Sequence, residues 1–94
     1  MMKEITDEKL EKYFSITKEA FEVAKKSGNR TELKDEREDF LDMIERYIKD
    51  AEVFEKNGVR VDAFAALNYA HGWLDAGARL GMFDVHDSRL FTVD

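Results

Sequence analysis

Four polar side chains with chemical potential recur at helical spacing in the C-terminal third of the chain: Asn68, His71, Asp75 and Arg79. Residues three and four apart share one face of a helix, so neighbours in this polar stripe can touch. In a binding or catalytic site, His71 would be the base or ligand, and Asp75 would orient its ring and raise its basicity. Arg79 would hold an anion, and the Asn68 amide would donate a hydrogen bond.

The same polar stripe also has a structural interpretation. A buried network of hydrogen bonds among these side chains would satisfy itself and set the register of the helix. A histidine followed by an aspartate four residues later is a common arrangement, so we assign no catalytic residue from it. Both interpretations stay open at the level of the sequence.

Other kinds of chemistry have little support in the residues. The chain has two histidines and no cysteine, which excludes disulfides and thiolate zinc sites. His86 lies between Asp84 and Asp87, but these residues do not form a closed set of metal ligands. The serines lie in no nucleophile elbow, and no glycine-rich phosphate loop follows a strand. We therefore predict no metal site and no cofactor.

Three helices must position the polar stripe. Proline is absent, and long stretches of helix-forming residues separate the first glycines, which predicts an all-α fold. We expect helices at about 6–27, 33–57 and 62–80, with short connections that favour antiparallel neighbours. The predicted fold is a three-helix up-and-down bundle in which residues 1–94 form a single domain. The remaining residues are too apolar for a free tail, so this short C-terminal segment should pack back on the bundle or onto a partner chain.

Capping residues mark the expected ends of these helices. Thr6 is a good N-cap for the first helix, and Gly28 should end it in the left-handed conformation. Gly58 should close the second helix. Asp62 should cap the third helix, and Gly81 should stop it.

The outer face of the second helix carries acids four residues before bases. The pairs are Asp42 with Arg46, Glu45 with Lys49, and Glu52 with Lys56. This order stabilises a helix by about 0.2–0.5 kcal/mol per pair. The acidic row Asp39, Asp42 and Glu45 therefore indicates a solvated face rather than a metal site.

The third helix departs from the pattern of an ordinary surface helix. From Asp62 to Gly81 only three of 20 residues are charged, and a helix this apolar is buried on more than one side. Glycine inside a helix costs about 1 kcal/mol relative to alanine, so Gly72 and Gly77 indicate close packing or a ligand or partner against the backbone. The residues that we expect at the packing surface or interface are Ala66, Ala70, Trp73, Leu74 and Gly77. Two helices cannot cover this surface, so the C-terminal segment or a second copy of the chain should.

The charge balance argues against two classes of partner. Fifteen basic and 21 acidic residues give a net charge of −6, whereas binders of nucleic acid or anionic membranes usually carry the opposite sign. The chain has no run of 18 apolar residues and no charged-then-apolar leader. We expect a cytoplasmic protein that binds neither membranes nor nucleic acid.

Several motifs between Tyr47 and Val85 point to a family. They are a Tyr-Ile-x-Asp-Ala start, the Gly58 turn, Asp-Ala-Phe-Ala-Ala, the core Asn-Tyr-Ala-His-Gly-Trp-Leu-Asp-Ala-Gly and a closing Arg-Leu-Gly. This pattern resembles the archaeal domain-of-unknown-function 357 family. The resemblance implies a short three-helix up-and-down bundle from an archaeon, and it brings no activity, substrate or cofactor. The family motif falls on Asn68, His71, Gly72, Trp73, Asp75, Gly77 and Arg79.

These observations favour a non-enzymatic helical module. It would self-associate, most simply as a homodimer, or bind a protein partner through the third helix and the C-terminal segment. The alternative is a small-ligand-binding protein or weak enzyme whose site is the polar stripe. The two hypotheses differ in whether the polar stripe faces a ligand or serves the architecture of the protein.

Overall fold

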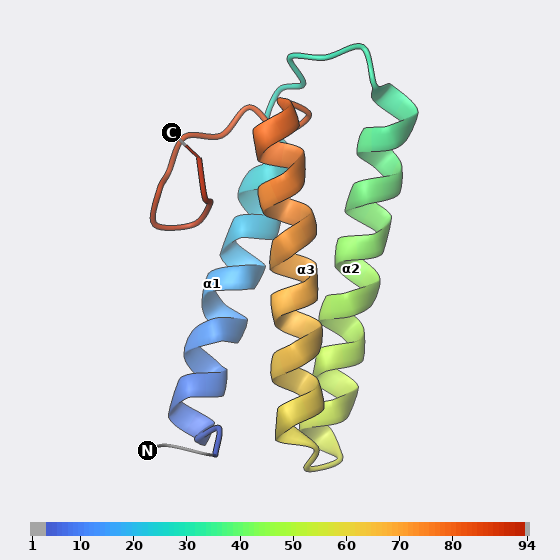
Figure 1. Ribbon diagram of the computed structural model, residues 1–94. Coiled ribbons are helices and arrows are strands. Elements are labelled where there is room, and N and C mark those ends of the chain that lie inside the picture. Colours follow the sequence, from blue (N-terminus) through green and yellow to red (C-terminus); the bar gives the residue numbers. More distant parts are fainter. Residues whose placement is uncertain (1–3, 94) are drawn as a thin grey trace.

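The computed structural model describes residues 4–93 and contains three helices, α1 (Asp7–Lys26), α2 (Lys34–Lys56) and α3 (Arg60–Leu80). Successive helices run antiparallel in an up-down-up order (Figure 1). Within residues 4–93 no residue forms a strand. The predicted all-α three-helix bundle is therefore confirmed.

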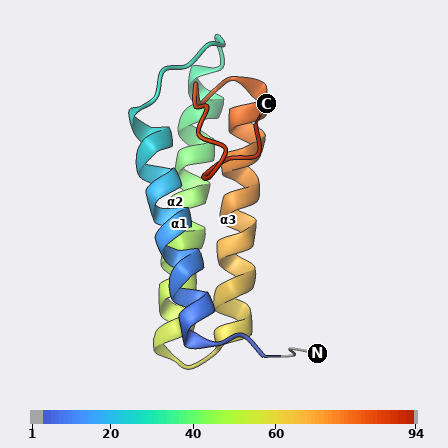
Figure 2. The same ribbon diagram turned by 90° about the vertical axis from the view of Figure 1, so that its left-hand side faces the viewer.

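α3 is the central helix of the bundle. It packs against α2 along most of its length and also against α1, whereas α1 and α2 contact each other much less. The chain after α3 lies on the α1 side of the bundle, away from α2 (Figures 1 and 2). In the part of the chain that the structure describes, no helix is both long and apolar enough to cross a membrane.

The first helix begins as the sequence predicts and ends differently. The Thr6 side chain accepts a hydrogen bond from the Lys9 amide at 3.1 Å, which satisfies one of the free N–H groups of the first turn. The prediction that Gly28 ends α1 in the left-handed conformation is wrong. Ser27 follows the helix with extended backbone, and its hydroxyl donates to the Ala24 carbonyl at 2.7 Å. A side-chain hydroxyl therefore caps this end, and no positive φ is needed.

The prediction that Asp62 caps α3 is also wrong, because the helix begins two residues earlier at Arg60. Gly58 adopts a φ of 78°, and this tight turn leads from α2 almost directly into α3. Val59 precedes the helix without a side-chain cap, and Asp62 lies in the first turn, where a helix dipole favours an acid. At the other end Gly81 has a φ of 89° and stops α3 as predicted.

Two buried clusters fill the bundle. The larger one joins all three helices to the chain after α3, and its members include Phe21, Ile44, Leu74, Phe83 and Leu90. The smaller one lies toward the start of α1 and comprises Leu10, Phe14, Ala51, Ala63, Ala66 and Leu67. Each large apolar side chain buried in this way contributes about 1.5–3 kcal/mol.

The surface of α2 carries two of the three predicted ion pairs. Asp42 binds Arg46 at 3.0 Å, and Glu45 binds Lys49 at 3.6 Å. Glu52 does not bind Lys56 as predicted but binds Lys18 of α1 at 3.0 Å. The reason is tertiary, because the α2 face that carries Glu52 is turned toward α1. Among residues 4–93 no group of three or more acids and histidines is placed to hold a metal ion.

Residues 82–93, here called the C-terminal segment, fold back on the bundle, which is the first of the two arrangements expected from their composition. Their apolar side chains Val85, Leu90 and Phe91 are buried. The Asp84 amide donates to the Gly28 carbonyl at 2.9 Å, which ties the segment to the α1–α2 connection. The segment is therefore a part of the core rather than a free tail.

Candidate functional site

His71 joins three parts of the chain. Its Nε2 lies 2.6 Å from the carbonyl oxygen of Leu90, and its Nδ1 lies 3.2 Å from the hydroxyl oxygen of Thr17 on α1. A carbonyl only accepts hydrogen bonds, so Nε2 donates to Leu90, and in the tautomer with its proton on Nε2 the Nδ1 atom accepts from the Thr17 hydroxyl. Both ring nitrogens are engaged, and α3 is thereby linked to α1 and to the C-terminal segment.

Asp75 binds the C-terminal segment one turn further along α3. Its Oδ1 accepts from the Thr92 amide at 2.8 Å, and its Oδ2 accepts from the Thr92 hydroxyl at 3.2 Å. The same carboxylate lies 4.0 Å from His71 Nε2, so these two side chains are neighbours, as expected. Asp75 does not bridge His71 and Arg79 as the spacing suggested, because both of its oxygens turn toward Thr92.

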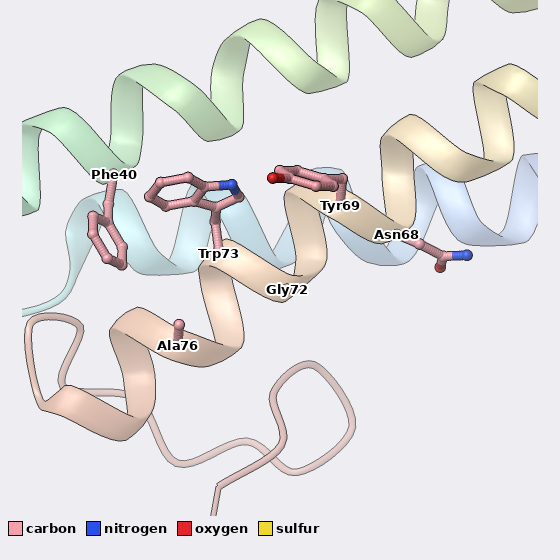
Figure 3. A pocket seen from close by; sticks show the side chains of 6 residues that line it. All are labelled: Phe40, Asn68, Tyr69, Gly72, Trp73 and Ala76. Atoms are coloured by element: carbon pink, nitrogen blue, oxygen red, sulfur yellow. The ribbon is translucent and has the colours of Figure 1, made fainter.

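We call the contacts of His71 and Asp75 with Leu90 and Thr92 the clamp. The other two members of the polar stripe lie apart from it. Asn68 and Arg79 are exposed, and the side chain of neither forms a hydrogen bond or ion pair with another residue among 4–93. Figure 3 shows the Asn68 side chain pointing away from the aromatic side of α3. The four predicted residues therefore share one helix face but do not converge on a single site.

The ion pair of Arg89 and Glu19 holds the same segment against α1. Arg89 Nη1 lies 3.1 Å from Glu19 Oε1, and Nη2 lies 2.5 Å from Oε2. The hydrogen bond from this guanidinium lowers the pKa of the Glu19 carboxyl from its ordinary value. The hydrogen bond to Glu19 in turn raises the pKa of Arg89.

The recess beside the clamp has a volume of about 400 Å³ and lies between α1, α3 and the C-terminal segment. His71 and Asp75, which line this recess, are hydrogen-bonded to Thr17, Leu90 and Thr92. While these bonds hold, the imidazole has no free nitrogen to take a proton from a substrate. The geometry of this pair supports an architectural role.

Arg37 is a structural residue that the sequence reasoning missed. Its guanidinium donates to the Met82 carbonyl at 2.6 Å and to the Ser27 carbonyl at 2.9 Å, and it lies over the Phe83 ring at 5.4 Å. In the sequence Arg37 stands among acids and bases between Lys34 and Glu38. No local pattern could reveal its partners, because the chain positions that it joins are far apart.

His86 and its flanking acids are held in separate contacts at the surface. His86 Nε2 lies 2.9 Å from Asp84 Oδ1, and Asp84 also binds Arg30 at 3.2 Å. Asp87 instead accepts from the Arg89 amide at 2.9 Å. The two acids therefore do not close around the imidazole.

Most of the small and apolar α3 residues expected at a packing surface or interface face the interior of the chain. Ala66, Ala70, Leu74 and Gly77 are buried. Trp73 is half-buried, and its indole meets the Phe40 ring edge to face, with ring centroids 4.7 Å apart. Of this expected set, Trp73 therefore keeps part of its surface open to a partner, and the rest of the open surface of α3 is formed mostly by other residues.

The two internal glycines of α3 lie in different surroundings. A Cβ added at Gly77 would overlap the ring of Phe83, so the C-terminal segment requires a glycine there. At Gly72 nothing lies within 4 Å of such a Cβ. Close packing within the chain therefore explains the glycine at position 77. No such contact within the chain explains the glycine at position 72.

Gly72 borders an apolar groove between α2 and α3. One recess of about 460 Å³ is lined by Phe40, Asn68, Tyr69, Gly72, Trp73 and Ala76. Figure 3 shows the rings of Phe40, Trp73 and Tyr69 following one another along this side of α3. A second recess of about 390 Å³ continues from Tyr69 and is lined by Tyr47, Asp50, Phe54, Asp62, Ala65, Ala66 and Tyr69. We call the two recesses together the α2/α3 groove.

The comparison with known proteins agrees with the motifs of α3. A family model described as Protein of unknown function (DUF357) matches residues 12–83, which include most of α1 and all of α2 and α3. Leu90 and Thr92, which bind the polar stripe, lie beyond the matched region. No curated protein and no solved structure matches this chain. Because the match covers well over half of the sequence, the chain belongs to the family of proteins of unknown function DUF357.

Proposed function

We propose that this protein is a non-enzymatic interaction module that binds a protein partner through the α2/α3 groove and the adjoining exposed face of α3. The observation that carries the proposal is the open apolar groove beside Gly72. The C-terminal segment lies on the α1 side of α3 (Figures 1 and 2), and none of residues 82–93 lines either recess of the groove.

The residue types in the groove support a protein partner. Tyrosine and tryptophan are enriched among the residues that contribute most to protein interfaces. Tyr69 is 56% exposed, and Leu80 at the end of the same face is 57% exposed. The Tyr69 ring packs on Tyr47 of α2 at 4.6 Å between centroids, so it is held in place before a partner arrives. Such preorganisation reduces the entropy lost on binding.

The exposed small residues of α3 support a helical partner. Ala65, Gly72 and Ala76 are exposed on this face, and small side chains let another helix backbone approach closely. Gly72 weakens the isolated helix by about 1 kcal/mol relative to alanine. A partner backbone packed against Gly72 would explain why a glycine stands at this position, which the packing within the chain does not explain.

A small ligand at the polar stripe has less support. A ligand that used His71 or Asp75 would have to replace the bonds to Leu90 and Thr92, and so detach the C-terminal segment. The buried side chains of that segment would then become exposed to water. We therefore place the function on the other side of α3.

Site-specific photo-crosslinking tests the proposal. A benzophenone amino acid would replace Ala76 or Ala65, which lie in the groove, in cells that naturally make the protein. The matched control carries the same group at Lys12, an exposed residue of α1. We expect a discrete crosslinked protein adduct from the groove positions and none from Lys12.

The opposite results would overturn the proposal. If both groove variants fold, as judged by circular dichroism, and give no adduct, the groove binds no protein. Equal adducts from the groove and from Lys12 would likewise remove the groove as the specific site.

A further inference from the structure

We propose that the partner is a second copy of this chain, bound by antiparallel packing of α3 on α3 about a twofold axis between Ala70 and His71. This inference rests on the proposed function and names the occupant of the same surface. It is argued from the order of the exposed residues along α3, their charges and their sizes.

The exposed face of α3 has the spacing of a coiled-coil seam. Six exposed positions follow one another at alternating steps of three and four residues: Asp62, Ala65, Tyr69, Gly72, Ala76 and Arg79. This is the a/d spacing by which two helices pack side chains of one into spaces of the other. Small residues at three of these positions permit a short distance between helix axes.

The seam is complementary to itself when reversed. Rotation about the point between Ala70 and His71 brings together Asp62 with Arg79, Ala65 with Ala76, and Tyr69 with Gly72. The flanking Val61 and Leu80, both exposed and apolar, are exchanged by the same rotation. A twofold interface must have this property, because each residue i that contacts j is repeated as j contacting i.

The charges select the antiparallel direction. Asp62 and Arg79 are exposed, and neither forms an ion pair with any residue that the structure describes. They lie near opposite ends of α3, about 26 Å apart along a helix axis. Antiparallel packing places Asp62 beside the partner's Arg79 twice in each dimer, whereas parallel packing would place like charges together.

The sizes of the side chains fit the same register. Tyr69 projects from the seam and is 56% exposed, and it meets the partner's Gly72 in the antiparallel arrangement. Gly72 has open space beyond its Cα, and the recess of about 460 Å³ lies beside it. The partner's Tyr69 would fill this space.

The surface is large enough for a stable dimer. The described part of the molecule measures 42 × 24 × 18 Å, and α3 is about 32 Å long. A standard interface buries about 800 Å² per partner, which the long face of such a bundle provides. The net charge of −6 opposes association at long range, but at physiological salt charges more than about 8 Å apart are largely screened.

Sedimentation equilibrium of the full chain at physiological salt tests the inference. We expect a monomer–dimer equilibrium for the wild type. Asp62→Arg and Arg79→Asp should each raise the dimer dissociation constant roughly tenfold or more, because two ion pairs become two like-charge contacts. An equimolar mixture of these two variants should form a heterodimer, because both contacts are then complementary again.

Matched controls separate the seam from general effects of charge and size. Glu11→Arg and Lys12→Asp make the same charge changes on α1 and should leave the dissociation constant within about twofold. Gly72→Gln should also weaken the dimer roughly tenfold, because it fills the space for the partner's Tyr69. Ser15→Gln on α1 is its control. Gly72 has open space around it, so this variant remains informative if a charge reversal impairs folding.

The outcomes distinguish this inference from the proposed function. The chain could stay monomeric at high micromolar concentration and form a groove crosslink to a different protein. That result overturns the inference that the partner is a second copy and supports the interaction module. A monomer without any groove crosslink overturns both. A dimer that Asp62→Arg, Arg79→Asp and Gly72→Gln leave unchanged uses another face, which overturns the α3 seam.

Discussion

Substituting alanine for Gly77 tests whether the C-terminal segment packs on α3, and Gly72 offers a matched comparison in the same helix. A methyl group at Gly77 would overlap the Phe83 ring, whereas nothing lies within 4 Å of one at Gly72. The helix propensity gained is the same at both sites. The difference between the two variants therefore measures the contact with Phe83.

The two substitutions should change stability in opposite directions. Replacing glycine by alanine inside a helix contributes about 0.5–1 kcal/mol. At Gly72 this gain stands alone, so the free energy of unfolding should rise by that amount. At Gly77 the ring of Phe83 is fully buried and cannot move aside freely, and overpacking costs about 1–3 kcal/mol. The net effect of Gly77→Ala is a loss of about 0.5–2 kcal/mol.

Urea unfolding followed by far-UV circular dichroism measures both values, at a concentration low enough to keep the chain monomeric. Thermal unfolding gives a second measure, because 1 kcal/mol moves the Tm by about 4–8 °C in a domain of this size. Phe83→Leu provides the control, since Gly77→Ala should cost less when the ring is absent. If Gly77→Ala is as stable as the wild type, or if Phe83→Leu does not change its cost, the packing of the C-terminal segment on α3 is refuted.

Three further predictions concern the contacts that hold the C-terminal segment. His71→Ala should lower the free energy of unfolding in urea by about 1–3 kcal/mol, because buried polar groups lose their partner; wild-type stability would contradict the clamp. Asp75→Ala should keep the bundle folded and speed hydrogen exchange of the Thr92 amide by NMR, and unchanged exchange would show that this bond contributes nothing. The pKa of Glu19 is lowered by Arg89, so the stabilisation from their pair is present above the ordinary value of 4.5 and is lost as the pH falls through the lower folded value. The Arg89 side-chain Nε–Hε NMR signal should shift more in that acidic range in the wild type than in Glu19→Gln, and equal shifts in both would exclude this pair as the cause.

The polar stripe shows how far local spacing reaches. Residues four apart on one helix face are neighbours in any helix, which is why the sequence placed His71 close to Asp75. Their strongest contacts go to Leu90 and Thr92, on a segment without regular secondary structure. A segment of that kind has no periodicity from which its register on α3 could be deduced.

The α3 glycines show the same limit. Glycine at two internal positions of a helix indicated a close approach, but two different causes fit that signal. Only the packing of Phe83 separates Gly77, which the chain itself requires, from Gly72, which faces open space.

The sequence alone was enough to predict the number, order and approximate length of the helices, because propensity and hydrophobic spacing act within each segment. It also determined the family, through motifs carried mostly by α3. The sequence did not predict which side of α3 the C-terminal segment covers and which side stays open. That choice depends on contacts such as Arg37 with Met82 and His71 with Leu90, which join residues far apart in the chain. Such contacts depend on how whole elements fit together, so no local pattern specifies them.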